Sequence, residues 1–121
     1  IFDKTTSCTT GDGNAAFELP AKFNGMKQVE VAGYHDGAAG TTGTMQVQIH
    51  NLTDGVDMLS TKLSTDSGEK SSRTAATPVV IDTAHDDVAT GDGIRVDVDA
   101  IHTTPAQGYI LTLGFDFPTT P

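Results

Sequence analysis

The chain has 121 residues, of which 36% are hydrophobic, and a formal net charge of −9. Its length fits one domain with a core of its own, and seven basic residues against sixteen acidic ones exclude the continuous positive patch that nucleic-acid binding requires. One cysteine excludes an intrachain disulfide, and the lack of a long apolar run excludes a transmembrane helix.

Alternating apolar and polar residues predict strands in the first half of the chain, at residues 14–19, 27–34 and 45–51. Pro20 confines the first of these to a sheet edge or a strand end. Gln46, Gln48 and His50 are expected on the polar face of the third. The expected inward residues are Ala15, Phe17, Leu19, Val29, Val31, Met45, Val47 and Ile49.

Turn signals separate these strands. Asn24-Gly25 is a candidate for a type I′ turn, and residues 35–43 form a glycine-rich loop. The four letters TGDG occur at residues 10–13 and again at 90–93, where they predict two turns that each lead into a strand.

The polar stretch STKLSTDSGEKSSRTAATP covers residues 60–78. Its first part continues an alternation that begins at residue 57, in which Thr takes the place of larger apolar residues, and Thr suits a pleated surface. We therefore predict a strand at residues 57–65 and a long polar connection at 66–76. Apolar strands on both sides make a flexible linker a poor interpretation.

The segment TPVVI at residues 77–81 begins another strand, and two further strands are predicted near the C-terminus, at residues 93–100 and 109–117. Between the polar stretch and these strands, residues 82–90 predict a single helical turn capped by Asp82 or Thr83. Several short strands with frequent turns indicate one all-β domain, an antiparallel sandwich or barrel. The expected inward residues are Ile94, Val96, Val98, Tyr109, Leu111, Leu113, Phe115 and Phe117, and the expected outward ones are Arg95, Asp97 and Asp99.

The sequence predicts no catalytic residues, no cofactor and no metal site. Asp97 and Asp99 are interpreted as a solvated strand face rather than an acid–base pair, and Cys8 as a tolerated thiol. The acidic loops at residues 12–14, 66–69 and 85–87 lack calcium-binding spacing, and turns use the same side chains for local hydrogen bonds. The four histidines lack zinc-binding spacing, and all four are expected at the surface: His35, His50, His85 and His102.

Residues 51–115, from NLTDGVDMLSTKLSTDSGEK through TAATPVVI and GDGIRVDVDAI to GYILTLGF, resemble a module of tailed-phage virion proteins. The resemblance implies a jelly-roll-like sandwich, without a catalytic motif. Such modules occur in head decoration (cement) proteins, head fibres and tail-associated proteins. The family pattern has an apolar residue just before the DSGE turn. Thr65 departs from it, which predicts that this strand end is exposed or covered by a neighbouring subunit.

A stand-alone chain of this size is most similar to a capsid decoration protein, and such proteins are commonly homotrimers. The resemblance thus implies a location on the outside of the virion capsid and binding to the major capsid protein. The acidic charge and the lack of a long apolar run predict that nucleic acid and membrane are not partners. The alternative is a receptor- or glycan-binding module of a head or tail fibre, although the chain has no Trp and two Tyr. A virion hydrolase ranks last, because the chain shows no catalytic constellation.

Three parts follow from this prediction: an N-terminal arm (1–13), a sandwich domain (14–117) and a C-terminal tail (118–121). The arm has an apolar tip that could dock on another subunit, and the last strand ends in an aromatic residue next to PTTP. The predicted partner-interface residues are Ile1, Phe2, Lys4 and Phe117.

Overall fold

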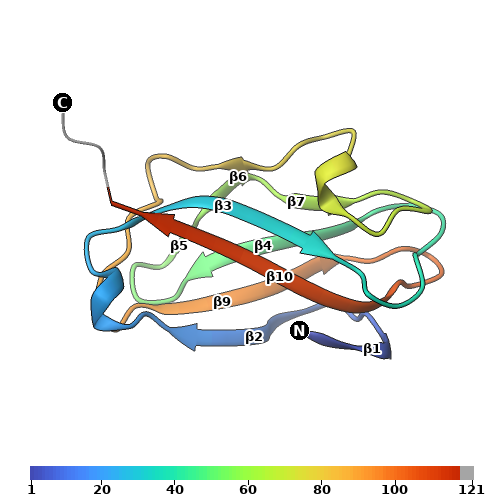
Figure 1. Cartoon of the computed structure of the whole chain (residues 1–121), viewed down its shortest axis with the longest axis horizontal. Coiled ribbons are helices and arrows are strands. Elements are labelled where there is room, and N and C mark those ends of the chain that lie inside the picture. The colour runs from blue at the N-terminus through green and yellow to red at the C-terminus, as the bar shows by residue number, and fades with distance from the viewer. Residues whose placement is uncertain (118–121) are drawn as a thin grey trace.

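The computed structural model of the protein describes residues 1–117, so the predicted tail lies outside the described residues. The chain is an antiparallel β-sandwich, as predicted (Figure 1). A three-stranded sheet has the order β1-β10-β3, and a five-stranded sheet has the order β2-β9-β4-β5, with β7 also paired to β4. A short ribbon of β6 and β8 lies beside them. The strands are β1 (Phe2–Ser7), β2 (Gly11–Glu18), β3 (Lys27–Tyr34), β4 (Met45–Asn51), β5 (Val56–Asp57), β6 (Leu59–Thr61), β7 (Leu63–Thr65), β8 (Val80–Ile81), β9 (Gly93–Ala100) and β10 (Gln107–Asp116).

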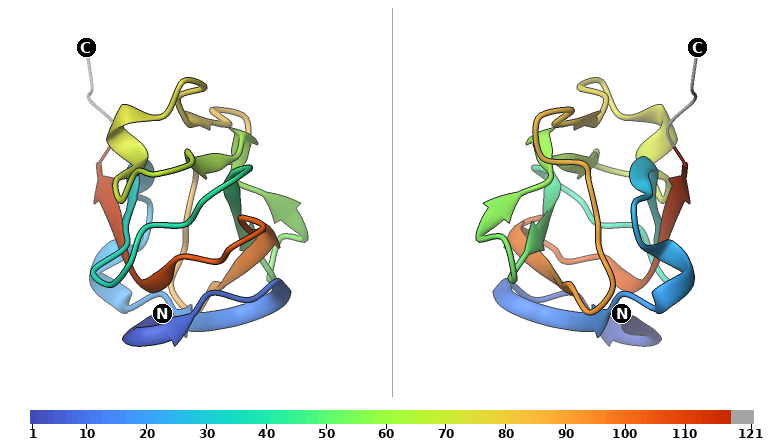
Figure 2. Two further views of the ribbon diagram at one scale, coloured as in Figure 1. Left: turned by 90° about the vertical axis from the view of Figure 1, so that its right-hand side faces the viewer. Right: turned by 90° about the vertical axis from the view of Figure 1, so that its left-hand side faces the viewer.

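The strand pairing is nested in the manner of a jelly roll. The first strand pairs with the last (β1 with β10), the second with the next to last (β2 with β9), and β4 with β7 further in. The chain crosses from one sheet to the other between β1 and β2, between β2 and β3, and between β3 and β4. The end-on views in Figure 2 show the strands arranged around a central core, with the segment that carries β8 across the top.

The core follows the predicted alternation where a strand has neighbours on both sides. In β4 and β9 the inward residues are all buried: Met45, Val47, Ile49, Ile94, Val96 and Val98. Both strands lie in the middle of the five-stranded sheet and face the other sheet, which keeps their inward face away from water.

The prediction that Val29 and Val31 share a face is wrong. The register of β3 against β10 shifts between Gly114 and Phe115, so that one extra residue of β3 is accommodated there. This β-bulge reverses the phase of the alternation. Gln28 and Val31 are buried, whereas Val29 is 56% exposed.

The predicted strand at residues 57–65 is interrupted at Lys62. Its first half, β6, pairs with β8, and its second half, β7, pairs with β4. The β6 segment covers the outer face of β4, where the side-chain amide of Gln48 donates to the Leu59 carbonyl at 3.0 Å and accepts from the Leu59 N–H at 3.1 Å. Gln48 is therefore buried, although the alternation predicts it on the wet face. Thr65 is also buried within its own fold, which contradicts the expected exposure.

The turns differ from the predictions in detail. The Met26 N–H donates to the Phe23 carbonyl, and Asn24 (φ −58°, ψ 124°) precedes Gly25 (φ 83°). These angles define a type II turn rather than type I′. Two 3₁₀ helices, η1 (Ala21–Phe23) and η2 (Ser72–Thr74), were not predicted from the sequence.

Two loop predictions have different outcomes. The first TGDG runs into β2 instead of preceding it. The helical turn predicted at residues 82–90 is instead a short hydrogen-bonded turn, in which the Asp82 carboxylate accepts from the Ala84 N–H and the Asp82 carbonyl accepts from the His85 N–H.

The segment predicted to be an arm is part of the sandwich. Residues 2–7 form β1 on the edge of β10, and the boundary drawn between residues 13 and 14 falls inside β2. The N-terminal strand covers only one end of β10, and this short overlap leaves much of the β10 edge open.

Candidate functional site

The edge of β10 that faces away from β3 is open beyond β1. On this edge β1 pairs with β10 at Gln107 and Tyr109, and the Ile1 amino group donates to the Tyr109 carbonyl. Within the described chain, no register pair joins residues 110–116 to a strand other than β3. More than half of the ten-residue strand thus has a neighbour on one side alone.

The register with β3 identifies the backbone groups that point to this open edge. Gly33, opposite Leu111, donates its N–H to Ser72 Oγ, away from β10. Gln28, opposite Phe115, donates its N–H to the Asp86 carbonyl, also away from β10. Gly33 and Leu111 are therefore opposite each other without hydrogen bonds between them. In such an antiparallel pair, the residue of β10 also points its N–H and C=O groups away from β3. The outward-pointing residues are therefore Leu111, Leu113 and Phe115, and no described residue is their backbone partner on that side.

The side chains of the same residues point into the sandwich but are incompletely covered. Tyr109, beside β1, is 1% exposed, whereas Leu111, Leu113 and Phe115 are each only partly buried against the core. Burial thus falls off along β10 beyond the position where β1 begins. These three side chains still point inward. They are less covered because, among the described residues, no strand lies beside this part of β10 on the side away from β3.

β2 is the edge strand of the other sheet and runs below β10 in Figure 1, and Phe17 lies near its C-terminal end. It pairs with Ile94, and directly opposite residues point to the same face of a sheet. Ile94 is completely buried, yet Phe17 is 41% exposed. The predicted inward orientation of Phe17 agrees with this register. We attribute this exposure to the short overlap of β1 with β10, because β1 and β2 are the edge strands of the two sheets and β1 pairs with β10 only at Gln107 and Tyr109.

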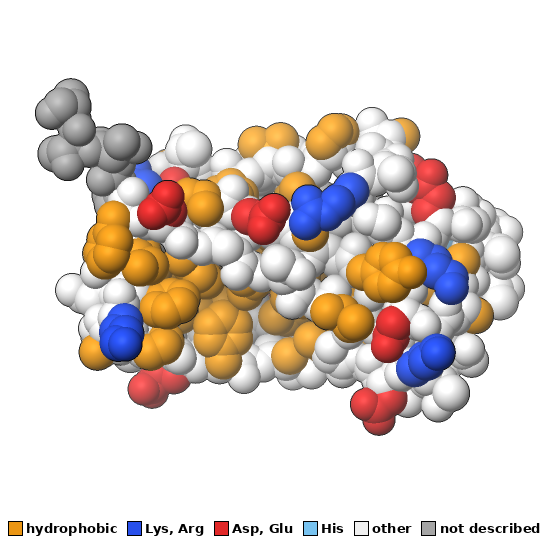
Figure 3. Space-filling model, viewed as in Figure 1, with side chains coloured by type: hydrophobic (Ala, Val, Ile, Leu, Met, Phe, Trp, Pro, Cys, Tyr) orange, Lys and Arg blue, Asp and Glu red, His pale blue; other side chains and the backbone are white. Residues whose placement is uncertain are grey.

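Phe23 of η1 closes one end of the opening. Its ring packs edge-on against Phe115, with centroids 5.4 Å apart. In Figure 3 hydrophobic side chains gather on the left part of the displayed face, below β10 and beside η1. We call this surface the β10 groove: it consists of Phe17, Phe23, Leu111, Leu113 and Phe115.

The predicted interface residues do not form one surface. Ile1 is 39% exposed, Phe2 packs partly against the core, and Lys4 is exposed on β1. Phe117 is exposed beyond the far end of β10, about 27 Å along the strand from Tyr109 at 3.4 Å per residue. The groove lies between these two ends, and sequence reasoning missed it. The sequence contained one sign of the groove: the last strand is long and apolar, whereas the first strand is short and polar.

A second cluster is fully enclosed by the fold. Cys8, His35, His102 and Tyr109 are each at most 1% exposed. His35 Nδ1 lies 2.8 Å from the Gly108 carbonyl and must carry the proton, because a carbonyl can only accept. The expectation of four surface histidines is therefore wrong for His35 and His102. Burial also raises the pKa of the Cys8 thiol to about 11, so this thiol is unreactive at neutral pH.

The buried histidine predicts a loss of stability in mild acid. Burial is the main cause that lowers the pKa of His35, and it outweighs the hydrogen bond to Gly108. As the pH falls below the unfolded value of about 6.5, the unfolded chain takes up a proton that the folded chain does not. The free energy of unfolding should therefore fall as the pH drops from 6.5 to 5.5.

Urea unfolding of the wild type and of His35→Asn, at several pH values in this interval, measures the loss. The Asn side chain keeps a donor near the Gly108 carbonyl but does not titrate. The variant should be less stable at pH 7 and should show a flatter pH dependence. An equal slope in both proteins would contradict the assignment.

The aspartates of β9 have different environments. Asp97, expected to be solvated, is buried, and it accepts two hydrogen bonds from Arg95 at 2.7 and 2.9 Å and one from the Gly13 N–H. Asp99 is more exposed and pairs with Lys62 at 2.9 Å. Ion pairs thus hold both carboxylates, and Asp97 anchors the start of β2 against β9.

Acidic side chains in and beside two of the acidic loops form local hydrogen bonds. Asp66 accepts from the Ala76 N–H, and Glu69 accepts from the Thr74 hydroxyl. Asp82 accepts from Ala84 and contacts His85 at 2.9 Å. Among residues 1–117, no three His, Cys, Asp or Glu side chains are arranged to hold a metal ion.

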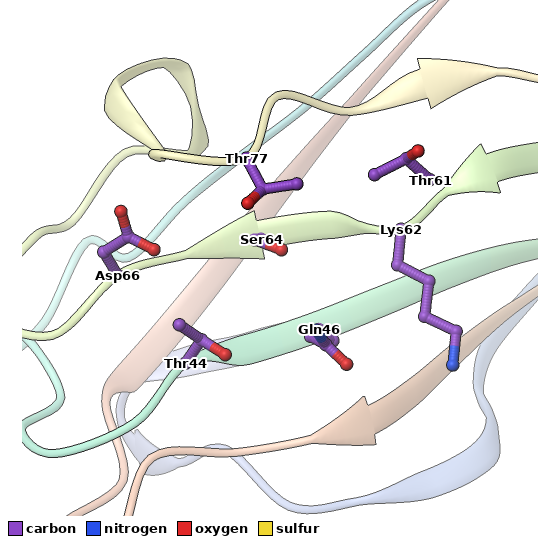
Figure 4. Close-up of a pocket in the computed structure, with 7 residues that line it drawn as sticks. All are labelled: Thr44, Gln46, Thr61, Lys62, Ser64, Asp66 and Thr77. Carbon is purple, nitrogen blue, oxygen red and sulfur yellow. The ribbon is translucent and has the colours of Figure 1, made fainter.

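A polar hollow of about 260 Å³ lies beside β4 and β7 (Figure 4). Lys62 extends along one side of it toward Asp99. Hydroxyl, amide and charged groups surround the hollow, so it can exchange hydrogen bonds with a polar ligand. Its lining residues are Thr44, Gln46, Thr61, Lys62, Ser64, Asp66 and Thr77.

Comparison of the chain with protein-family models, curated proteins and solved structures finds no match. The part of the chain that the structure describes contains no apolar helix of the length that a membrane span requires. The geometry of this chain is therefore the observation that bears on function, and the resemblance of residues 51–115 stays a sequence-based expectation.

Proposed function

We propose that this protein is a structural module of a bacteriophage virion that decorates the outer surface of the capsid and stabilises it. The β10 groove is the observation that carries the proposal, because an open strand edge beside uncovered apolar side chains is a typical protein-binding surface. The resemblance of residues 51–115 to virion modules gives the class of partner, the major capsid protein.

In this role the protein acts by burying surface. A rigid sandwich that binds adjacent capsid subunits adds interface area between them, and expansion of the shell would have to expose that area to water again. The ion pairs of β9 and the buried core keep the domain rigid. Rigidity matters because a stiff bridge transmits load between the subunits that it joins.

We further propose that the module is a homotrimer on the capsid, as the resemblance implies. Contacts between copies in such an assembly would cover edges other than the open part of β10, such as those of the five-stranded sheet at β2 and β5. Multi-angle light scattering at micromolar concentration measures the mass in solution. A mass of three chains supports the trimer, and a monomer mass at all concentrations would refute a trimer that forms without the capsid.

The decoration function predicts that the protein binds undecorated capsids of its phage and raises the temperature at which they release DNA. Co-sedimentation measures binding, and dye access to the packaged DNA during heating measures stabilisation. Capsids that neither bind the protein nor gain heat resistance would refute the function.

The polar hollow supports a second candidate function, binding of a glycan receptor. Its hydroxyl and amide groups suit sugar hydroxyls, although its lining lacks the aromatic residue on which sugar rings commonly stack. A glycan array distinguishes the two functions. A hit that is lost in Gln46→Ala and Ser64→Ala supports the receptor-binding module, and an array without hits removes it.

A further inference from the structure

We infer that the β10 groove binds an extended segment of another polypeptide chain, which adds a strand to the three-stranded sheet. The proposed function supplies the identity of that chain, a capsid subunit. The mode of binding depends only on the geometry of β10, β2 and η1, so the two can be tested separately.

The backbone of β10 requires an extended partner. Leu111, Leu113 and Phe115 present N–H and C=O groups at every second residue, spaced about 6.8 Å apart. A strand presents its own free groups at the same spacing, whereas a helix has none to offer along its length. Strand addition of this kind draws affinity from main-chain hydrogen bonds and specificity from alternate side chains.

The position of β1 indicates where the added strand lies. β1 already occupies the same edge, antiparallel to β10, with Phe2 opposite Tyr109. A segment beside residues 111–115 would continue the line of β1 and complete the edge of the sheet. We infer the same antiparallel direction, which preserves the wholly antiparallel pattern of the sandwich.

The side chains around the groove select the partner's sequence. Every second residue of the added strand would point inward, toward Phe17, Phe23 and Phe115. Apolar residues at these positions would cover rings that are now exposed to water. The alternate positions face solvent and tolerate polar residues.

Charge argues against a second copy of this chain as the occupant. Each copy carries a net charge of −9, so edge-to-edge pairing of two copies would oppose like charges. Asp116 would also approach the edge of its neighbour from the end of each β10. A neutral or basic segment of a different protein avoids this repulsion.

A designed peptide tests the groove directly. The probe is a ten-residue peptide of alternating Val and Thr with Lys at both ends, titrated into the ¹⁵N-labelled protein. We expect amide shifts at residues 111–115 and 15–18, and about tenfold weaker binding to Phe17→Lys, which places a charge in the apolar groove. Ile110→Lys is the matched control, because Ile110 is 52% exposed on the opposite face of β10. It should bind as the wild type does.

The inference is overturned if the peptide leaves the amides of residues 111–115 unmoved, or if Phe17→Lys binds it as tightly as the wild type. Thermal melting of both variants checks that they are folded.

Capsid binding then separates the two proposals. Peptide binding without capsid binding refutes the decoration function and leaves the groove in place. Equal capsid binding by the wild type and Phe17→Lys supports decoration and overturns the groove as the contact.

Discussion

Gly33→Ala should destabilise the protein by about 3 kcal/mol, a large part of the stability of a domain of this size. A β-carbon on Gly33 would overlap the hydroxyl oxygen and Cζ of Tyr109 and would lie 2.8 Å from its Cε1. Tyr109 cannot retreat, because it is buried and packs against His35 with ring centroids 4.9 Å apart. Urea unfolding followed by circular dichroism measures the loss.

Gly93→Ala is the matched control for this substitution. Gly93 also lies in a strand, and a β-carbon there would meet no atom closer than Leu52 Cβ at 3.6 Å. Its stability should change by less than about 1 kcal/mol. Similar losses in both variants would show that strand glycine itself, and not the contact with Tyr109, determines the cost.

Ile49→Ala should lower the free energy of unfolding by roughly 3 kcal/mol, because it removes buried methyl groups and leaves a cavity. Ile49 is completely buried in β4, opposite Val96 of β9. Leu52→Ala, one residue beyond β4 and 49% exposed, should cost less than about 1 kcal/mol. Chemical denaturation measures the free energy of unfolding of the two variants. Comparable losses in both would contradict the placement of the core.

The sequence was sufficient to predict the central strands. In β4 and β9 the alternation is regular, and each strand has a partner on both sides, so a period of two translates directly into burial. The same rule failed at Val29. A bulge changes which residues face inward, and nothing in KQVEVAGY marks where the extra residue falls.

The buried histidines escaped prediction because tertiary contacts determine their burial. A β-carbon on Gly40 would overlap the His102 ring, so the glycine-rich loop packs directly on this side chain. The sequence shows a polar loop and an isolated histidine. Only the fold brings Gly40 and His102 together.

The candidate site could be predicted only in part. The inward orientation of Phe17 followed from NAAFELP, but its exposure depends on which strand lies opposite, and that strand is distant in sequence. Likewise the backbone N–H and C=O groups of Leu111 and Leu113 lack a partner strand because β1 overlaps only a short part of β10. Non-local pairing of this kind is invisible to periodicity within one segment.

Amide hydrogen exchange tests the central claim most directly, because it reports whether the β10 edge is open and whether a partner closes it. In the free protein, the amides of Leu111 and Leu113 should exchange much faster than those of Thr112 and Gly114, which point toward β3. On undecorated capsids, the amides of Leu111 and Leu113 should become protected. Slow exchange of these two amides in the free protein, or unchanged fast exchange on capsids that bind it, would contradict the account.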